Sequence, residues 1–299
     1  MVIKRTRSDL IFDTVNNIIM IISLLLVAYP LIFIISASFS NPADVQNGTM
    51  WLLPTHVTLE GYKTLFRTGD IWIGYKNTIV YAVFGTMINL VCTVSSGYAL
   101  SRKDFMIRGF IMKFFSLTMF FSGGLIPTYL LMKSFGFLDT IWAMIIPGAV
   151  SVYNMVMCRT FFQMTIPDEL LEAAQVDGCG DFRFFAMIVI PLSGALIAVM
   201  VLFFAVGHWN TYFNGLIYLT DRKKYSLQMV LQEILVNQNM SQVDSSLSSM
   251  DVTESLRRQR LADSIKYGVI IVGSLPVLLL YPLIQKYFVK GIMVGSIKG

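Results

Sequence analysis

The sequence predicts an all-α membrane protein with six transmembrane helices and both termini in the cytoplasm. Of the 299 residues, 55% are hydrophobic and only 14% are charged, whereas a soluble domain normally has about 25% charged residues. Six charge-free windows are each long enough to cross the roughly 30 Å hydrocarbon core of a bilayer as a helix. No segment shows the period-2 alternation of a membrane β-barrel, so the backbone polar groups must be satisfied within helices.

The six windows follow one another along the chain. They are residues 14–43, 77–101, 114–132, 140–158, 184–220 and 267–285. The first apolar stretch is longer than the core of a signal peptide and lacks a small-residue cleavage site, so we expect it to be retained. We expect a terminal segment 1–13, a first transmembrane helix at 14–37, a core at 77–285 and a tail at 286–299.

An even number of spans places both termini on one side of the membrane. With cytoplasmic termini, twelve of the 23 Lys and Arg residues fall on the cytoplasmic side. The total number of basic residues on each side is therefore almost equal, and by the positive-inside rule this total hardly favours either orientation. The short connection 101–113 carries four basic residues and one acid, and together with the basic N-terminus it favours cytoplasmic termini.

The composition argues against several classes of function. The net charge of +5 is spread along the chain, without the basic stripe that nucleic-acid binding requires. Cys92, Cys158 and Cys179 are odd in number and lack CxxC spacing, which disfavours a disulfide framework and a thiolate metal site. His56 and His208 stand far apart in the sequence, so we expect no metal.

Two long connections are expected outside the cytoplasm, at residues 38–76 and 221–264. Within the first, residues 59–66 have the pattern of a short amphipathic helix at the surface. Within the second, residues 225–235 form a plausible helix ahead of the serine-rich residues 245–249. Loops of this length often bind a partner, although a plain solvated connection is an equal alternative.

Residues 165–183 are a polar-headed stretch between two apolar spans. Pro167 suits the first position of a helix, and Asp168 and Glu169 favour the positive end of its dipole. Gly178 can end this helix in the left-handed conformation, and Asp181 can cap a second helix that enters the membrane. Taken alone, this pattern is that of a helical loop between spans.

The same stretch carries a motif. Glu172-Ala173-Ala174, followed by Gly178, Ile188 and Pro191, resembles the EAA motif of ABC-importer permeases. Cys179 and Ile190 stand where that motif usually has alanine and leucine. Further segments are similar to carbohydrate permeases of the MalG-like type, and these are residues 51–66, 98–102, 166–170, 209–210, 216–219 and 287–299. Residues 225–235 are most similar to the oligosaccharide branch of that family.

The resemblance implies the type I ABC importer permease fold and ATP-driven import of a carbohydrate, in this branch an oligosaccharide. The chain has no G-x-x-x-x-G-K-[ST] motif to hold nucleotide phosphates. We therefore expect a transport subunit, not an enzyme, with ATP and Mg bound by a separate dimer of ATP-binding cassette ATPases. The further partners implied are a second permease subunit, an extracytoplasmic solute-binding protein and the lipid of the bacterial cytoplasmic membrane.

The resemblance also implies roles for individual residues. The residues expected to couple the permease to the ATPase are Glu169, Glu172, Ala173, Ala174, Asp177 and Gly178. Glu172 would be the polar anchor, the two alanines would form the close-contact surface, and Gly178 would form the turn. Candidates for the substrate pathway are polar or aromatic residues of the spans, namely Asn89, Tyr153, Asn154, Trp209, Asn210 and Asn214. Trp209 with Asn210 is the strongest pair. Each candidate alone also fits helix–helix hydrogen bonding or an interfacial position.

Two other classes of function agree less well with the sequence. A secondary transporter or channel would need ion-coupling charges within the membrane, and the six windows contain none. Broken-helix repeats are not evident in the sequence. A membrane-embedded enzyme lacks a catalytic constellation of His, Asp or Ser. A permease for a solute other than a carbohydrate stays open as an alternative.

Overall fold

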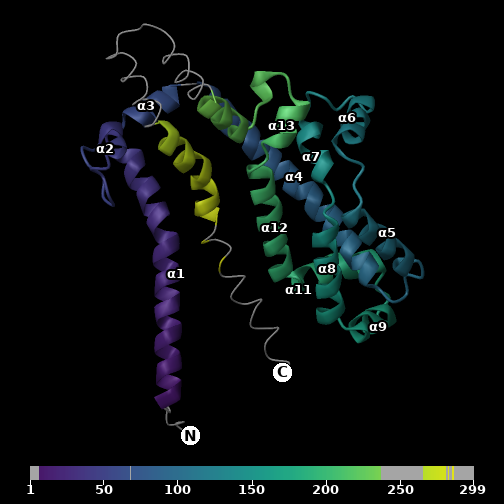
Figure 1. Cartoon of the computed structure of the whole chain (residues 1–299). Helices are drawn as coiled ribbons and strands as arrows, with labels where there is room; N and C mark the ends of the chain where they lie inside the picture. The colour runs from purple at the N-terminus through teal and green to yellow at the C-terminus, as the bar shows by residue number, and fades with distance from the viewer. Residues whose placement is uncertain (1–6, 68, 237–264, 281, 283–284, 286–299) are drawn as a thin grey trace. The chain divides into compact units, whose positions relative to one another are not determined.

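The computed structural model describes residues 7–67, 69–236, 265–280, 282 and 285 (Figure 1). These residues form helices and connecting loops with no strand among them, which confirms the all-α class. The chain divides into two compact units. The first comprises Met1–Gly69 and Leu231–Leu275, and the second comprises Asp70–Val230 and Pro276–Gly299.

The first unit is built around α1 (Arg7–Phe39), a long apolar helix. It is followed by α2 (Pro42–Gln46) and α3 (Glu60–Arg67), and α3 confirms the helix predicted at residues 59–66. The start of helix Ile265–Leu280 belongs to the same unit, where the ring of Tyr267 meets that of Phe33 edge-on at 6.2 Å.

The connection after α1 folds back onto the end of that helix. The Ser36 hydroxyl donates to the Leu52 carbonyl at 2.7 Å, and the Tyr62 hydroxyl donates to Ser38 at 2.9 Å. The Thr58 amide donates to the carbonyl of Phe39 at 2.8 Å. The polar last turns of α1 are thus held by hydrogen bonds from their own loop.

The second unit contains most of the other described helices. They are α4 (Gly69–Ser101), α5 (Arg108–Phe120), α6 (Leu125–Ser134), α7 (Ile141–Ile145), α8 (Val152–Thr165), α9 (Asp168–Val176), α10 (Asp181–Phe184), α11 (Ile190–Leu192), α12 (Gly194–Trp209) and α13 (Phe213–Tyr218). Because α4 begins at Gly69, the last part of the connection predicted at 38–76 is helical. In Figure 1, α9 and α13 lie at opposite ends of the pair formed by α8 and α12.

Three of the predicted spans are bent in the structure. The bend is 116° between α5 and α6, 53° between Ile141–Gly148 and α8, and 82° between Asp181–Leu192 and α12. The second and third breaks follow Pro147 and Pro191, and the first contains a glycine pair that ends at Gly124 with φ +83°. Proline removes a backbone donor and clashes with the preceding turn, which explains the second and third breaks. The first break is explained by Gly124, because glycine adopts a positive φ readily. The apolar windows alone did not reveal any of the three.

The number of spans stays a prediction. Among the described residues, α1 and α4 are long and apolar enough to cross a membrane, and five spans result if each bent pair counts as one. The predicted window 267–285 coincides with helix Ile265–Leu280 but extends outside the described residues. Helix Leu227–Val236 confirms the one expected at 225–235, whereas residues 245–249 and 286–299 lie outside the described part.

The core of the second unit joins α9 to the long helices. Its buried residues include Val94 of α4, Phe162 of α8, Leu171 of α9 and Met200 of α12. At Gly97 of α4, an added Cβ would lie 2.6 Å from the Cβ of Cys158 on α8, so glycine is what allows these helices to approach so closely. One continuous core therefore carries both the apolar helices and the polar stretch predicted at 165–183.

Candidate functional site

The predicted EAA stretch folds as a short helix, α9, that spans Asp168–Val176. Asp168 and Glu169 occupy its first turn, as the sequence predicts, where a carboxylate favours the positive end of the helix dipole. Pro167 precedes the helix in an extended conformation and is not its first residue. Asp181 likewise begins α10 without capping it, since the residue before the helix is Gly180.

The end of α9 is a Schellman motif. Gly178 has φ +74°, the left-handed conformation expected from the sequence. The Gly178 amide donates to the Gln175 carbonyl at 3.0 Å, and the Cys179 amide donates to the Ala174 carbonyl at 2.9 Å. These two bonds satisfy carbonyls at the helix end and turn the chain sharply toward α10.

The two faces of α9 have different environments. Leu171 and Ala174 are buried in the core shared with α4, α8 and α12. Glu172, Ala173 and Asp177 are exposed together with Gly178. The assignment of Ala174 to a close-contact surface therefore needs correction, because its side chain is only 8% exposed and packs inward. Ala173 is the motif alanine that a partner can reach.

Apolar side chains extend the exposed side of this region. Val176 in the last turn of α9 is 88% exposed, and Phe182 in α10 is 84% exposed. The sequence places both within 165–183 but does not show which way they point. Val176 follows Glu172 by four residues, so these two exposed side chains share one side of α9.

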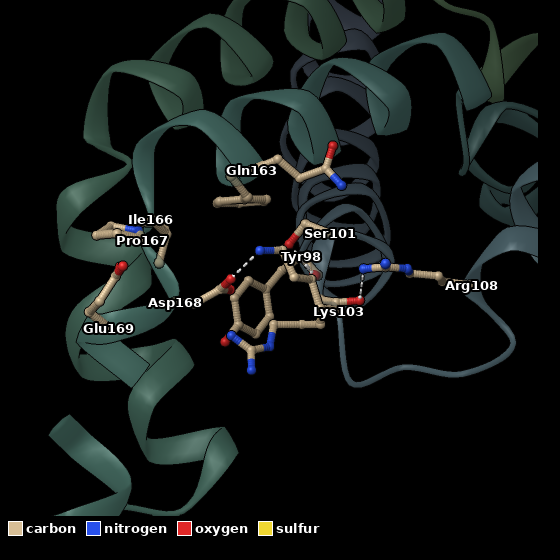
Figure 2. A pocket seen from close by; sticks show the side chains of 11 residues that line it. Tyr98, Ser101, Lys103, Arg108, Gln163, Ile166, Pro167, Asp168 and Glu169 are labelled. Carbon is tan, nitrogen blue, oxygen red and sulfur yellow. Dashed lines mark hydrogen bonds and ion pairs between the residues drawn. The ribbon is translucent and has the colours of Figure 1, made fainter. Parts of the chain in front are cut away.

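A pocket of about 390 Å³ lies beside the start of α9 (Figure 2). Lys103, in the connection after α4, contacts Asp168 with 2.6 Å between Nζ and Oδ2. The hydrogen bond from Lys103 lowers the pKa of Asp168 below its usual range, and the same bond raises the pKa of Lys103. Arg108 donates to the carbonyl of Arg102 at 2.7 Å and fixes the shape of this connection.

This ion pair was not predicted from the sequence, in which the basic connection 101–113 and the acidic start of α9 are separate features. Their opposite charges were the available signal, but nothing in the spacing shows that two segments more than sixty residues apart meet.

The substrate-pathway candidates separate into two groups. Asn89, Asn154 and Asn214 line one cavity of about 210 Å³, which we call the amide cavity. Tyr153 lines an adjoining open pocket that also includes Asn154. The structure thus brings together residues of α4, α8 and α13 that lie far apart in the sequence.

Trp209 and Asn210 do not line either pocket. Trp209 is buried, and its ring lies 6.1 Å from that of Tyr75. Asn210 is the exposed residue that ends α12. His208 is buried at the amide cavity, and its ring packs so closely on Gly85 that an added Cβ there would collide with it.

A polar cluster lies at the end of this unit opposite α9. Asp139, with φ +57°, accepts hydrogen bonds from the amides of Thr220 and Asp221 at 3.2 and 3.1 Å. Lys224 donates to the Asp139 carboxylate at 2.9 Å, and this hydrogen bond is the main cause of the lowered pKa of Asp139. Asn77 of α4 donates to the carbonyl of Lys223 at 2.8 Å. The start of the connection predicted at 221–264 is thereby tied to α4.

Known proteins resemble the chain over almost its whole length, although no family model matches it. It is 38% identical to the polygalacturonan/rhamnogalacturonan transport system permease protein YtcP of Bacillus subtilis, over 97% of this chain and 99% of that protein. It is 35% identical to protein LplC of the same species, over 98% and 97%. It is 25% identical to the arabinooligosaccharides transport system permease protein AraQ of Halalkalibacterium halodurans, over 91% of each.

A solved structure agrees with these relatives. A chain of a bacterial ABC transporter involved in the import of the acidic polysaccharide alginate superposes with a TM-score of 0.82 and 31% identity. The superposition covers 95% of this chain and 99% of that one. The sequence motif, the docked α9 helix and these similarities lead to one conclusion: the chain belongs to the permease subunits of ABC carbohydrate importers.

Proposed function

We propose that this permease imports an oligosaccharide across the bacterial cytoplasmic membrane, driven by a separate ATPase dimer that docks on α9. The division of α9 into two faces is the observation that carries the proposal. Leu171 and Ala174 belong to the same core as the long helices. Close-packed cores transmit displacement because they deform little, so a force on the exposed face would move α4, α8 and α12 together with α9.

The exposed residues take the roles at the ATPase. Glu172 supplies a charge for hydrogen bonding, Ala173 lets the partner surface approach closely, and Val176 adds apolar area. Asp177 and Gly178 form the turn, and Glu169 lies at the edge of the neighbouring pocket. ATP and Mg would be bound by the ATPase, whose closure selects one of two arrangements of the permease.

The two long connections expected outside the cytoplasm suit the other partners. We assign the contact with an extracytoplasmic solute-binding protein to residues 38–76 and 221–264, and we expect a second permease subunit to complete the pathway. With α9 in the cytoplasm, a six-span topology has both termini there. The names of YtcP and AraQ, which refer to polymeric and oligomeric saccharides, support an oligosaccharide as cargo.

Substitution of Glu172 tests the docking surface. Glu172→Lys reverses an exposed charge, so we expect the variant to insert normally but to lose most uptake and to retain little ATPase on affinity purification. Glu172→Gln, which removes the charge but keeps the shape, should give an intermediate loss. Full uptake and ATPase recovery with Glu172→Lys would show that α9 is a connector only.

The glycines around the turn provide a matched pair. Gly178 and Gly180 both have open space where a Cβ would lie, but only Gly178 has a positive φ. Gly178→Asp should therefore distort the end of α9 and reduce uptake at least tenfold, whereas Gly180→Asp places a favourable residue before α10 and should be tolerated. Purification of the intact chain without an ATPase or a second permease, combined with ATP-independent uptake, would contradict the whole proposal.

A further inference from the structure

We infer that the amide cavity is a binding site for one uncharged sugar unit, so that this chain itself holds part of the saccharide during transport. The inference deepens the pathway part of the proposed function and rests on it. It is carried by a buried, unpaired hydrogen-bond acceptor, by the composition of the lining and by the size of the cavity.

The unpaired acceptor belongs to Asn89. This residue of α4 is 3% exposed, and its Nδ2 donates to the carbonyl of Gly148 at 3.1 Å. Its Oδ1 is buried and has no hydrogen-bond partner among the described residues. Buried polar atoms are nearly always paired, so this amide, with one half anchored and the other half unpaired, lacks a donor that a ligand hydroxyl would supply once the atoms covering its oxygen move aside.

The rest of the lining matches a sugar ring. Asn154 and Asn214 add two further amides, and Phe203 of α12 adds an aromatic side chain. An apolar lining with a few convergent polar groups is the usual form of a small-molecule site. Aromatic rings cover the C–H faces of sugars, while amides donate to and accept from hydroxyl groups.

The lining also limits the charge of the ligand. It contains no Lys, Arg, Asp or Glu, and the imidazole of His208 rests against Gly85 of α4. A sugar carboxylate placed here would lose its hydration without gaining a fixed cation. The site therefore selects the hydroxylated, uncharged part of a saccharide, and any carboxylate of the cargo must lie outside it.

The size of the cavity fits a single unit. The cavity has a volume of about 210 Å³, and the open pocket at Tyr153 shares Asn154 and Phe203 with it. One pyranose ring fits the amide cavity, and further units of a saccharide would continue into the adjoining pocket. Gly207 of α12 lines the cavity, and an added Cβ there would meet no atom within 4 Å, so a larger side chain at this position enters the space that the sugar would occupy.

The test uses the whole transporter in nanodiscs, without the solute-binding protein, and two probes that differ only in one group. They are methyl galactopyranoside and the corresponding galacturonoside, in which a carboxylate replaces the hydroxymethyl group. Ligand-observed NMR titration should give saturable binding of the neutral glycoside and at least tenfold weaker binding of the charged one. Equal binding of both, or no binding of either, would overturn the inference.

Variants locate the site. Gly207→Leu should weaken binding of the neutral glycoside at least tenfold, and Gly207→Ala should weaken it less. Gly194→Leu is the matched control, because Gly194 also lies in α12 with open space around its Cβ but does not line the cavity. Unchanged binding in a folded Gly207→Leu transporter would assign the sugar to another place. Since binding is measured without ATP, it does not depend on whether α9 is the coupling helix.

Discussion

The two longest helices, α1 and α4, each have 33 residues but are used in different ways. No residue in the most apolar stretch of α1 is buried, whereas 39% of the residues in the most apolar stretch of α4 are buried. The buried side of α4 includes Thr78, Gly85, Asn89 and Gly97. Small and polar residues thus mark the face of an apolar helix that packs against its neighbours, and the same face carries the amide cavity.

The largest expected difference is in the loss of stability when a larger side chain is introduced into α4 or into α1. Gly85→Leu on α4 would drive the side chain into the ring of His208, and overpacking of this kind costs about 3 kcal/mol. Ser23→Leu on the exposed side of α1 should change stability by less than about 0.5 kcal/mol. Thermal unfolding of the purified transporter measures both. Equal tolerance at the two positions would remove the distinction between the helices.

A smaller effect is expected at the contact between α4 and α8. Gly97→Ala brings a methyl group against Cys158, and we expect a destabilisation of about 1–2 kcal/mol. Ser95→Ala, on the exposed side of α4, is the control. The double variant Gly97→Ala/Cys158→Gly should recover part of the stability that Gly97→Ala loses. The comparison must first subtract the cost of glycine within a helix, which is about 1 kcal/mol. Strict additivity of the two changes would show that the residues do not interact.

The smallest effect concerns the ends of the two helices. The end of α1 is closed by neutral hydrogen bonds such as that from Ser36, whereas the end of α4 is linked to α9 by the Lys103–Asp168 pair. The pair is exposed, so Lys103→Met should leave the unfolding temperature nearly unchanged. It should raise the pKa of Asp168 toward the ordinary value of 3.8, as read by NMR of labelled aspartate.

The pH dependence of this pair follows from the two shifts. Because the pKa of Asp168 is lowered, its contribution is present above the ordinary value of 3.8 and is lost as the pH falls through the folded value. Because the pKa of Lys103 is raised, its contribution is present below 10.5 and is lost at still higher pH. High salt should weaken the pair at neutral pH. An Asp168 pKa that is insensitive to both Lys103→Met and salt would contradict the contact.

Several elements could be predicted from the sequence because their causes are local. The apolar windows, the acidic first turn of α9 and the glycine turn at Gly178 each depend on residues within a few positions of one another. The helices at 59–66 and 225–235 were predicted for the same reason. The bends after Pro147 and Pro191 could be predicted because proline breaks or kinks a helix, but their angles depend on the packing of neighbouring helices.

The candidate site was predicted less completely. The motif located α9, yet it did not distinguish Ala173, which is exposed, from Ala174, which is buried. Trp209 with Asn210 was the strongest candidate pair for the pathway, but neither residue lines the cavity that Asn89, Asn154 and Asn214 line. A span that is apolar all round gives no periodic signal for its buried face, so only contacts across the fold assign these residues.

The sequence by itself determined that this is a helical membrane protein with a short polar-headed helix between two apolar spans, since hydropathy and helix capping are properties of short segments. The tertiary structure decided which side of α9 is free, that Lys103 meets Asp168, and that three distant asparagines surround one cavity. The physical reason is that these features arise from close approach between helices, at glycines such as Gly85 and Gly97, and no single segment contains both partners of such a contact.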